Sequence, residues 1–146
     1  MMSKVDFFLS VQDEKEVVEA ILLAEKDTSG EIRVHIEKET SIAPFERAIE
    51  VFYELRMNET KASNGVLIYV ATKDQKLAIC GDKGINDVVP IDFWESTKSI
   101  VIEHFKRNEF KSGLVEGILK AGQELKKYFP YQNDDIDELS NEISKG

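Results

Sequence analysis

The apolar run at residues 66–71, VLIYVA, places the strongest constraint on how this chain folds. It carries no charge and is rich in β-branched and aromatic side chains, so it predicts a strand that is buried on both faces of a sheet. A polar turn at residues 73–75 follows, and residues 77–80 form a second apolar run. This order predicts a hairpin in which the second strand returns antiparallel to the first.

Upstream, residues 31–38 alternate between apolar and polar side chains, which is the period of a strand with one face in the core. Between this strand and residues 66–71 lies a segment with apolar residues at helical spacing and Pro44 near its first turn. The stripe that we expect this helix to bury consists of Phe45, Ala48, Ile49, Phe52 and Leu55. Strand, helix and strand in this order predict a parallel pair joined by a right-handed crossover.

Helical patterns recur along the rest of the chain. In one of them, Asp92 and Glu95 have the spacing of a capping box. A fourth, short strand is expected near residues 5–9 or around Val88, where the pattern is weak. The further predicted helices are residues 11–26, 92–105, 112–128 and 134–143.

Together these elements predict an α/β fold, a three-layer α/β/α sandwich around a small mixed central sheet of about four strands. A chain of 146 residues is long enough to bury a core of its own. We therefore expect one domain over residues 1–146, with residues 131–146 as an acidic helix or tail docked on it.

The charge and the cysteine content limit the partners. The chain has 19 Lys and Arg residues against 28 Asp and Glu residues, a formal net charge of −9, which opposes binding to nucleic acid. Its single cysteine, Cys80, cannot form an internal disulfide, and no apolar stretch reaches the length of a membrane span or of a signal-peptide core. We therefore expect a cytoplasmic protein without a membrane span, and the sequence names no protein partner.

The predicted topology gathers oxygen-bearing side chains at one edge of the sheet. The strands at residues 31–38 and 66–71 begin at this edge, and the strand at residues 77–80 ends there. The loops at residues 58–63 and 82–90 must meet at the same edge. The candidate metal ligands at this edge are Glu31, Glu59, Asp82, Asn86, Asp87 and Asp92.

Crowded carboxylates repel one another and tend to hold protons unless a cation offsets their charge. Calcium and magnesium prefer carboxylate, amide and backbone oxygens, whereas zinc favours histidine and cysteine. His35 and His104 have no ligand spacing to each other or to Cys80, so we expect both histidines to be structural or solvent-facing and Cys80 to be a buried, inert thiol. The sequence therefore predicts a calcium or magnesium site.

Each candidate ligand also has an interpretation that needs no ion. Asp82, Asn86 and Asp87 are residue types that hydrogen-bond their own backbone in turns. Asp92 suits the cap of a helix, and Glu31 suits the first position of a strand. Both interpretations stay open at the level of sequence.

Four segments occur in a characteristic order: TSGEIRV at residues 28–34, NGVLIYVA at 64–71, GDKGI at 81–85 and FKSGLVEGI at 110–118, followed by FP and DDIDELSNEI. With these segments the chain resembles the TPM domain family, which is named for thylakoid lumen proteins of photosystem repair and has bacterial members. The resemblance implies an α/β/α sandwich, divalent metal binding and, for some members, acid phosphatase activity. It also implies a role at the metal site for Gly81, Asp82, Gly84, Asp87 and Asp92.

Three functions follow as hypotheses. The first is a metal-binding TPM domain in which calcium or magnesium stabilises the loops at one end of the sheet, with a metal-responsive regulatory or accessory role. The second is a metal-dependent acid phosphatase that uses the same carboxylates, with Lys83 helping to hold the phosphate. The sequence shows no activated nucleophile, so it leaves open whether the chain is an enzyme. The third is a protein-interaction domain without a ligand.

Overall fold

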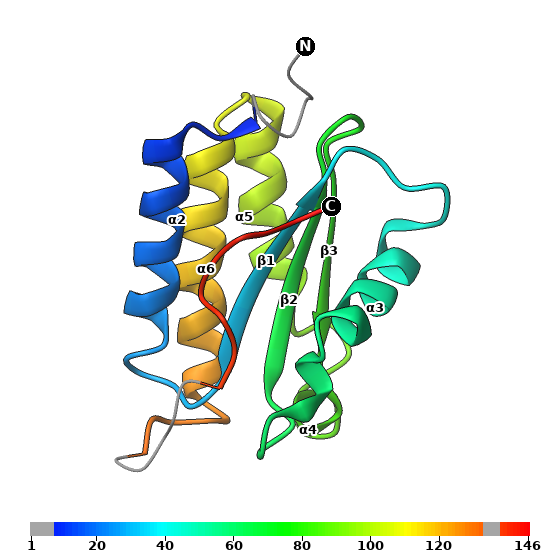
Figure 1. The fold of residues 1–146 in the computed structure, drawn as a ribbon. Coiled ribbons are helices and arrows are strands. Elements are labelled where there is room, and N and C mark those ends of the chain that lie inside the picture. Colours follow the sequence, from blue (N-terminus) through cyan, green and yellow to red (C-terminus); the bar gives the residue numbers. More distant parts are fainter. Residues whose placement is uncertain (1–7, 133–137) are drawn as a thin grey trace.

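A four-stranded sheet with the order β3-β2-β1-β4 lies at the centre of the fold (Figure 1). The computed structural model describes residues 8–132 and 138–146. β1 pairs in parallel with β2 and with β4, and β2 pairs antiparallel with β3, so the predicted parallel pair and hairpin are both confirmed. The strands are β1 (Glu31–Glu37), β2 (Gly65–Ala71), β3 (Lys76–Gly81) and β4 (Ser144–Lys145).

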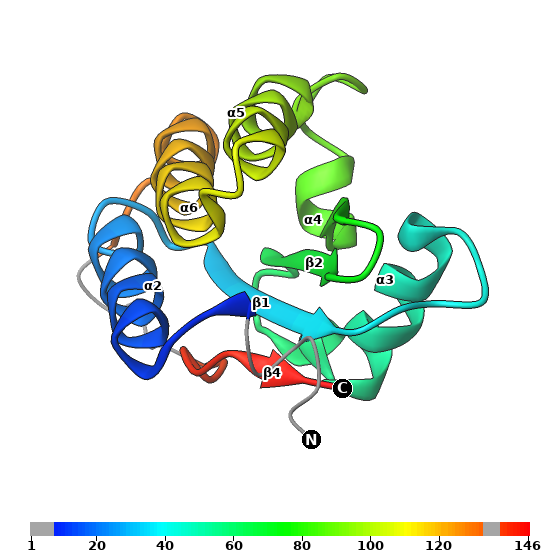
Figure 2. The same cartoon turned by 90° about the horizontal axis from the view of Figure 1, so that it is seen from above.

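Helices cover both faces of this sheet, as seen from above in Figure 2. α2 (Val11–Ala24), α5 (Glu95–Lys106) and α6 (Phe110–Lys126) cover one face. α3 (Pro44–Glu54) covers the other, and the short η1 (Met57–Glu59) and α4 (Lys83–Asn86) lie in the connections at one end. The predicted three-layer α/β/α sandwich with a mixed sheet is confirmed. In the part of the chain that the structure describes, no helix is long and apolar enough to cross a membrane.

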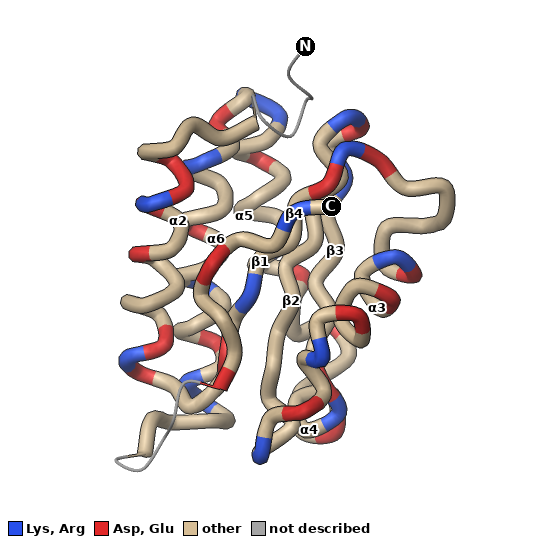
Figure 3. The backbone as a smooth tube through the Cα atoms, in the orientation of Figure 1, with Lys and Arg blue, Asp and Glu red and all other residues tan. Residues whose placement is uncertain are grey.

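Every residue of β2 is buried, so this strand contributes to the core on both faces of the sheet. Val66, Ile68 and Val70 belong to the larger core beneath α2, α5 and α6, whereas Leu67 and Tyr69 belong to the smaller core beneath α3. Figure 3 shows the consequence for charge: β2 has no charged position, and the surrounding helices carry both signs. The prediction of a strand buried on both faces is confirmed.

β1 was predicted as a strand with one face in the core, and in the structure its other face is largely buried as well. Ile32, Val34 and Ile36 enter the larger core as expected, but His35 and Glu37 on the opposite side are only 4% and 6% exposed. Alternation reports which side is apolar, and it does not report what covers the polar side. Here α3 and the C-terminal segment cover it.

The stripe predicted for α3 is only partly buried. Ala48 and Phe52 lie in the smaller core together with Val51, whereas Phe45 and Ile49 are 53% and 38% exposed. The side of α3 that meets the sheet is therefore rotated away from the predicted stripe. The exposed side of α3 carries both apolar and acidic side chains, namely Phe45, Ile49 and Tyr53 beside Glu46, Glu50 and Glu54.

The fourth strand of the described sheet lies neither at Val88 nor at residues 8 and 9, and residues 5–7 of the other predicted place lie outside the described part. Val88 lies in a turn, and Phe8 and Leu9, the described end of the other segment, are buried in the larger core, where Phe8 stacks on Phe110 with a centroid distance of 4.3 Å. Instead Ser144 and Lys145 pair with His35 and Ile36 of β1. The partner of an edge strand is chosen by tertiary contacts, which leave no local pattern in the sequence.

Two helix boundaries also differ from prediction. α5 begins at Glu95 without a side-chain cap, and Asp92 lies in the turn before it, so the predicted capping box is absent. The helix predicted at residues 134–143 does not form over residues 138–143, which are irregular with bends at Leu139 and Glu142, while residues 134–137 lie outside the described part.

Candidate metal site at one edge of the sheet

The starts of β1 and β2 and the end of β3 meet at one edge of the sheet, as the topology predicts. In the ladder Glu31 pairs with Gly65, and Val66 pairs with Gly81, so the backbone of Asp82 is opposite Gly65. Paired residues share a face of a sheet. Glu31 and Asp82 therefore flank Gly65 on the face that α3 covers.

Asp82 is the most informative side chain at this edge. It is 8% exposed, its backbone N–H donates to the Gly65 carbonyl at 2.9 Å, and its Oδ1 accepts from the N–H of Lys83 at 2.7 Å. These contacts make it the N-terminal cap of α4. Its second oxygen, Oδ2, is buried and has no hydrogen-bond partner among the described residues. A buried carboxylate oxygen without a donor is unfavourable, and a cation is one way to satisfy it.

The loop before β2 brings backbone oxygens to the same turn. A Cβ atom on Gly84 would meet the carbonyl oxygens of Ala62 and Ser63 at separations that real Cβ atoms do not tolerate. Ser63 itself has a φ of 50°, in the left-handed region. Glycine at position 84 therefore lets α4 approach these two carbonyls closely.

Asn64 fixes this loop against β1. Its side-chain amide donates to the Ser29 carbonyl at 2.9 Å, and its backbone carbonyl accepts from the N–H of Glu31 at 3.2 Å. Its own N–H donates to Oγ1 of Thr60 at 3.3 Å. The carbonyls of Ala62 and Ser63 are thus held in place by hydrogen bonds on the next residue.

Asn86 and Asp87 lie at the far end of α4, closer to solvent. The side-chain amide of Asn86 donates to the Gly81 carbonyl at 2.9 Å, which leaves its Oδ1 as an acceptor. Oδ2 of Asp87 accepts from Nζ of Lys83 at 3.0 Å, and the Asp87 side chain is 58% exposed. Both side chains therefore bond within residues 81–87, as is common in turns. Both residues are exposed, so side-chain oxygens of Asn86 and Asp87 remain at the surface.

The carboxylate of Glu31 forms hydrogen bonds to the C-terminal segment. Its Oε1 accepts hydrogen bonds from the backbone N–H groups of Glu138 and Leu139 at 2.6 and 2.7 Å. The space over Gly65, between Glu31 and Asp82, is filled by Met57 and Leu139. The carboxylate of Glu31 therefore anchors the C-terminal segment, and apolar atoms separate it from Asp82.

Glu59 and Asp92 stand apart from Asp82. Glu59 pairs with Arg56 at 2.6 Å on the surface. Asp92 is exposed in the turn before α5, where its carbonyl accepts from the N–H of Glu95 at 3.1 Å. Within residues 8–132 and 138–146, no three His, Cys, Asp or Glu side chains are grouped as metal ligands. Of the predicted side chains, Asp82, Asn86 and Asp87 lie together in the turn that contains α4.

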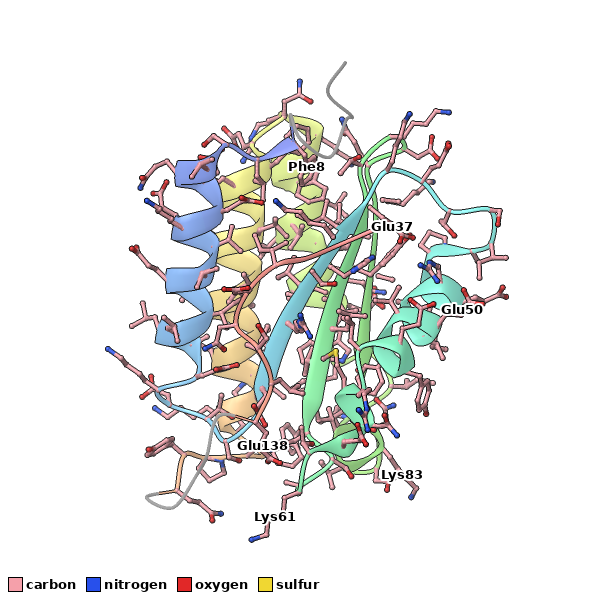
Figure 4. All side chains as sticks on the ribbon, viewed as in Figure 1. Phe8, Glu37, Glu50, Lys61, Lys83 and Glu138 are labelled. Atoms are coloured by element: carbon pink, nitrogen blue, oxygen red, sulfur yellow. The ribbon has the colours of Figure 1, made fainter. Side chains whose placement is uncertain are left out.

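Sequence reasoning missed a second polar cluster, at the opposite end of β1, where Figure 4 labels Glu37. Oε2 of Glu37 accepts from Nε of Arg47 at 2.9 Å and from the hydroxyl of Tyr69 at 2.5 Å. Its Oε1 is 3.0 Å from Nε2 of His35, whose Nδ1 is 2.9 Å from Oγ of Ser144. The cluster therefore joins α3, β1, β2 and β4.

Electrostatics fix the charge at the centre of this cluster. Burial acts to raise the pKa of Glu37, but hydrogen bonds from Arg47, Tyr69 and His35 outweigh it and lower this pKa to about 2. Burial and the bond to Glu37 raise the pKa of Tyr69 above its usual value. The carboxylate is thus ionised and fully engaged, which suits a structural clamp. The polar side of β1 was the sequence signal for this cluster, but the alternation predicted only that the apolar side of the strand lies in the core.

The remaining reactive side chains behave as expected. Cys80 is buried, and burial raises the pKa of its thiol to about 11, so the thiol is inert at neutral pH. His104 lies on the surface between Glu116 and Glu109, at 2.7 and 2.8 Å, and these hydrogen bonds raise the pKa of the imidazole.

Comparison with known proteins gives a consistent result. A family model described as the TPM domain matches residues 5–124. The NMR structure of the BA42 protein from the psychrophilic bacterium Bizionia argentinensis is 58% identical, with a TM-score of 0.92, and the match covers 99% of this chain and 100% of that chain. No curated protein sequence matches.

Two more distant structures share the fold alone. The N-terminal domain of a protein from P. gingivalis is 19% identical with a TM-score of 0.68, over 84% of this chain and 79% of that chain. The N-terminal domain of a protein from Corynebacterium glutamicum is 8% identical with a TM-score of 0.63, over 94% of this chain and 81% of that chain.

Proposed function

This chain belongs to the TPM domain family, and from that premise we propose that it binds a divalent cation, calcium or magnesium, in the turn between β3 and α4. The buried, unpartnered Oδ2 of Asp82 is the observation that carries the proposal. Bound there, the ion replaces the missing donor and offsets the buried charge.

The donor set around Asp82 suits calcium chemistry. It combines one buried carboxylate oxygen, the carbonyls of Ala62 and Ser63 that approach Gly84, and the surface oxygens of Asn86 and Asp87. Calcium accepts six to eight oxygens in flexible geometry, with backbone carbonyls and water among them, whereas magnesium demands a near-ideal octahedron. The net charge of −9 favours either cation over an anionic ligand.

Binding at this turn stabilises the loops at that edge of the sheet. Residues 60–64 belong to one of these loops, and the N–H of Lys61 donates to the carboxylate of Glu138 at 3.2 Å. Figure 4 shows Lys61 and Glu138 at the same end of the molecule as Lys83 of α4. An ion that orders this loop therefore also favours docking of the C-terminal segment, which gives the domain a metal-responsive element.

Titration with calcium, followed by amide NMR, tests the proposal. The amide signals of residues 60–65 and 81–87 shift first. The free energy of unfolding rises by about 2.7 kcal/mol when the calcium concentration is a hundred times the dissociation constant. Asp82→Asn removes the carboxylate oxygen and weakens binding. Asp92→Asn removes the same charge from an exposed acid near this edge and leaves binding intact.

Magnesium titrated in the same way identifies the preferred ion. The proposal is contradicted if the amide chemical shifts of residues 60–65 and 81–87 stay unchanged at millimolar concentrations of both cations. So does an equal loss of affinity in Asp82→Asn and Asp92→Asn, because that result indicates only diffuse attraction to an acidic surface.

A further inference from the structure

The exposed side of α3 carries an apolar stripe, bordered by Glu46, Glu50 and Glu54, that residues 8–132 and 138–146 do not cover. Phe45, Ile49 and Tyr53 are 53%, 38% and 59% exposed and lie four residues apart, which places them on one side of the helix. Phe45 and Ile49 belong to the stripe that sequence periodicity predicted to be buried. Large apolar side chains that follow one another on a single helix face are typical of a contact surface.

β3 is an edge strand of the sheet (Figure 1), and Phe45 of the stripe lines the same groove as Leu77 and Ile79 of β3. Because the N–H of Asp82 bonds to Gly65 of β2, the alternation of an antiparallel ladder turns the backbone groups of Leu77 and Ile79 away from β2. No other strand pairs with β3 on that side in the part of the chain that the structure describes. The six residues of β3 include no proline, so each of them has a backbone N–H that can donate to a neighbouring strand.

An apolar groove of about 460 Å³ runs along this edge. Pro44 and Phe45 of α3 form one wall, Ile91 and Trp94 at the start of α5 form the other, and Leu77 and Ile79 of β3 lie at its base. α3 and α5 lie on opposite faces of the sheet, so they border the edge strand from both sides (Figure 2). Ile91 is fully exposed.

We propose that the groove binds an extended peptide segment of another protein, which adds a strand to β3. Backbone hydrogen bonds to Leu77 and Ile79 supply the pairing, and the walls receive alternate apolar side chains of the peptide. β3 is about 20 Å long at the usual rise, which matches a strand of ordinary length.

The preferred peptide alternates apolar with basic side chains. Among the charged residues that line the groove, Glu95 and Lys98 pair with each other at 3.0 Å, so neither sign prevails there. The field over the groove is then that of the whole chain, with its net charge of −9, which attracts basic segments. A second copy of this chain fits less well, because two copies that each carry a net charge of −9 repel each other.

The probe is a heptapeptide of alternating lysine and valine with blocked ends, titrated in the presence of chelator so that the outcome is independent of the cation site. The amides of residues 77–81 shift, and the fluorescence of Trp94, the only tryptophan of the chain, changes with them. N-methylation of alternate peptide amides retains the side chains and blocks the pairing edge, and it abolishes both signals. A glutamate–valine peptide binds more weakly.

Exposed variants locate the site without disturbing the core. Phe45→Ser and Ile91→Ser each leave the charge unchanged and reduce affinity by about tenfold, as expected for apolar contacts at the centre of an interface. The matched control Leu22→Ser alters an apolar residue of α2 that is 46% exposed, and it retains full affinity.

Three results overturn the proposal. One is a titration at millimolar peptide that leaves residues 77–81 unchanged, and another is equal binding of the N-methylated peptide. The third is a concentration-dependent dimer in sedimentation equilibrium that Phe45→Ser abolishes, because that assigns the groove to a second copy of the chain.

Discussion

The hydroxyl of Tyr69 on β2 donates a hydrogen bond of 2.5 Å to Oε2 of Glu37 at the end of β1. Both side chains are buried, and the same carboxylate oxygen also accepts from Arg47 of α3. This contact joins the two parallel strands to the helix that connects them. It therefore lies at the centre of the polar cluster around Glu37, which was not predicted from the sequence.

Tyr69→Phe removes this hydrogen bond and leaves the ring in place. We expect the free energy of unfolding to fall by about 1.5–3 kcal/mol, the range for a hydrogen bond to a charged group. Urea denaturation at neutral pH measures the change. Tyr53→Phe, which alters an exposed tyrosine of α3, serves as the control and changes little, and equal effects of the two variants would contradict the assignment.

Stability should depend on pH through Glu37. Its pKa falls from 4.5 in the unfolded chain to about 2 in the folded protein, so between these values the folded state binds fewer protons. The stabilisation from Glu37 is complete above about pH 4.5 and is lost as the pH falls toward 2. Unfolding curves across this range measure it. Glu37→Gln lowers stability at neutral pH and flattens the dependence, and an unchanged slope in that variant would show that other carboxylates cause it.

Gly84→Ala tests the close approach of α4 to the loop before β2. The added Cβ meets the carbonyls of Ala62 and Ser63, which belong to backbone and cannot rotate away. We expect a loss of about 1–3 kcal/mol in stability, together with NMR shifts in residues 60–64. Lys83→Ala, at a neighbouring position that is 82% exposed, is the control. If Gly84→Ala and Lys83→Ala change the stability equally, α4 lies farther from the carbonyls of Ala62 and Ser63 than the structure shows.

Glu31→Ala should release the C-terminal segment. Its carboxylate accepts from the N–H groups of Glu138 and Leu139, so the variant loses two hydrogen bonds to a charged group. Hydrogen exchange of residues 138–146 then accelerates well before global unfolding. Glu31→Gln keeps an acceptor oxygen and restores part of the protection. Exchange rates that stay the same in Glu31→Ala would mean that β4 and Ser144 hold the segment without Glu31.

Cys80 should react only in the unfolded protein. The thiol is buried in the smaller core, and its pKa is raised to about 11, so little thiolate is present or accessible at pH 8. Alkylation followed by mass spectrometry gives a slow rate in buffer and a fast one in concentrated urea. Rapid labelling of the native protein would contradict the burial of Cys80.

The sequence by itself determined the elements whose pattern is local. The uncharged run of β2 could only be stable between two helical layers, and the alternation of β1 with the helical spacing of α3 set the parallel crossover. Since parallel strands begin at the same edge, the sequence also determined that Glu31, Asn64 and Asp82 lie at one end of the sheet. The assignment to the TPM family follows from the same segments and is confirmed.

The tertiary structure alone decided what covers each surface. Glu31 finds its partners more than a hundred residues later, at Glu138 and Leu139, and His35 finds Ser144. Periodicity records which side of an element is apolar, but the choice of partner depends on chain segments that are distant in sequence. For this reason the polar side of β1 is buried, the apolar side of α3 at Phe45 is exposed, and Asp82 is separated from Glu31 although both lie at the same edge.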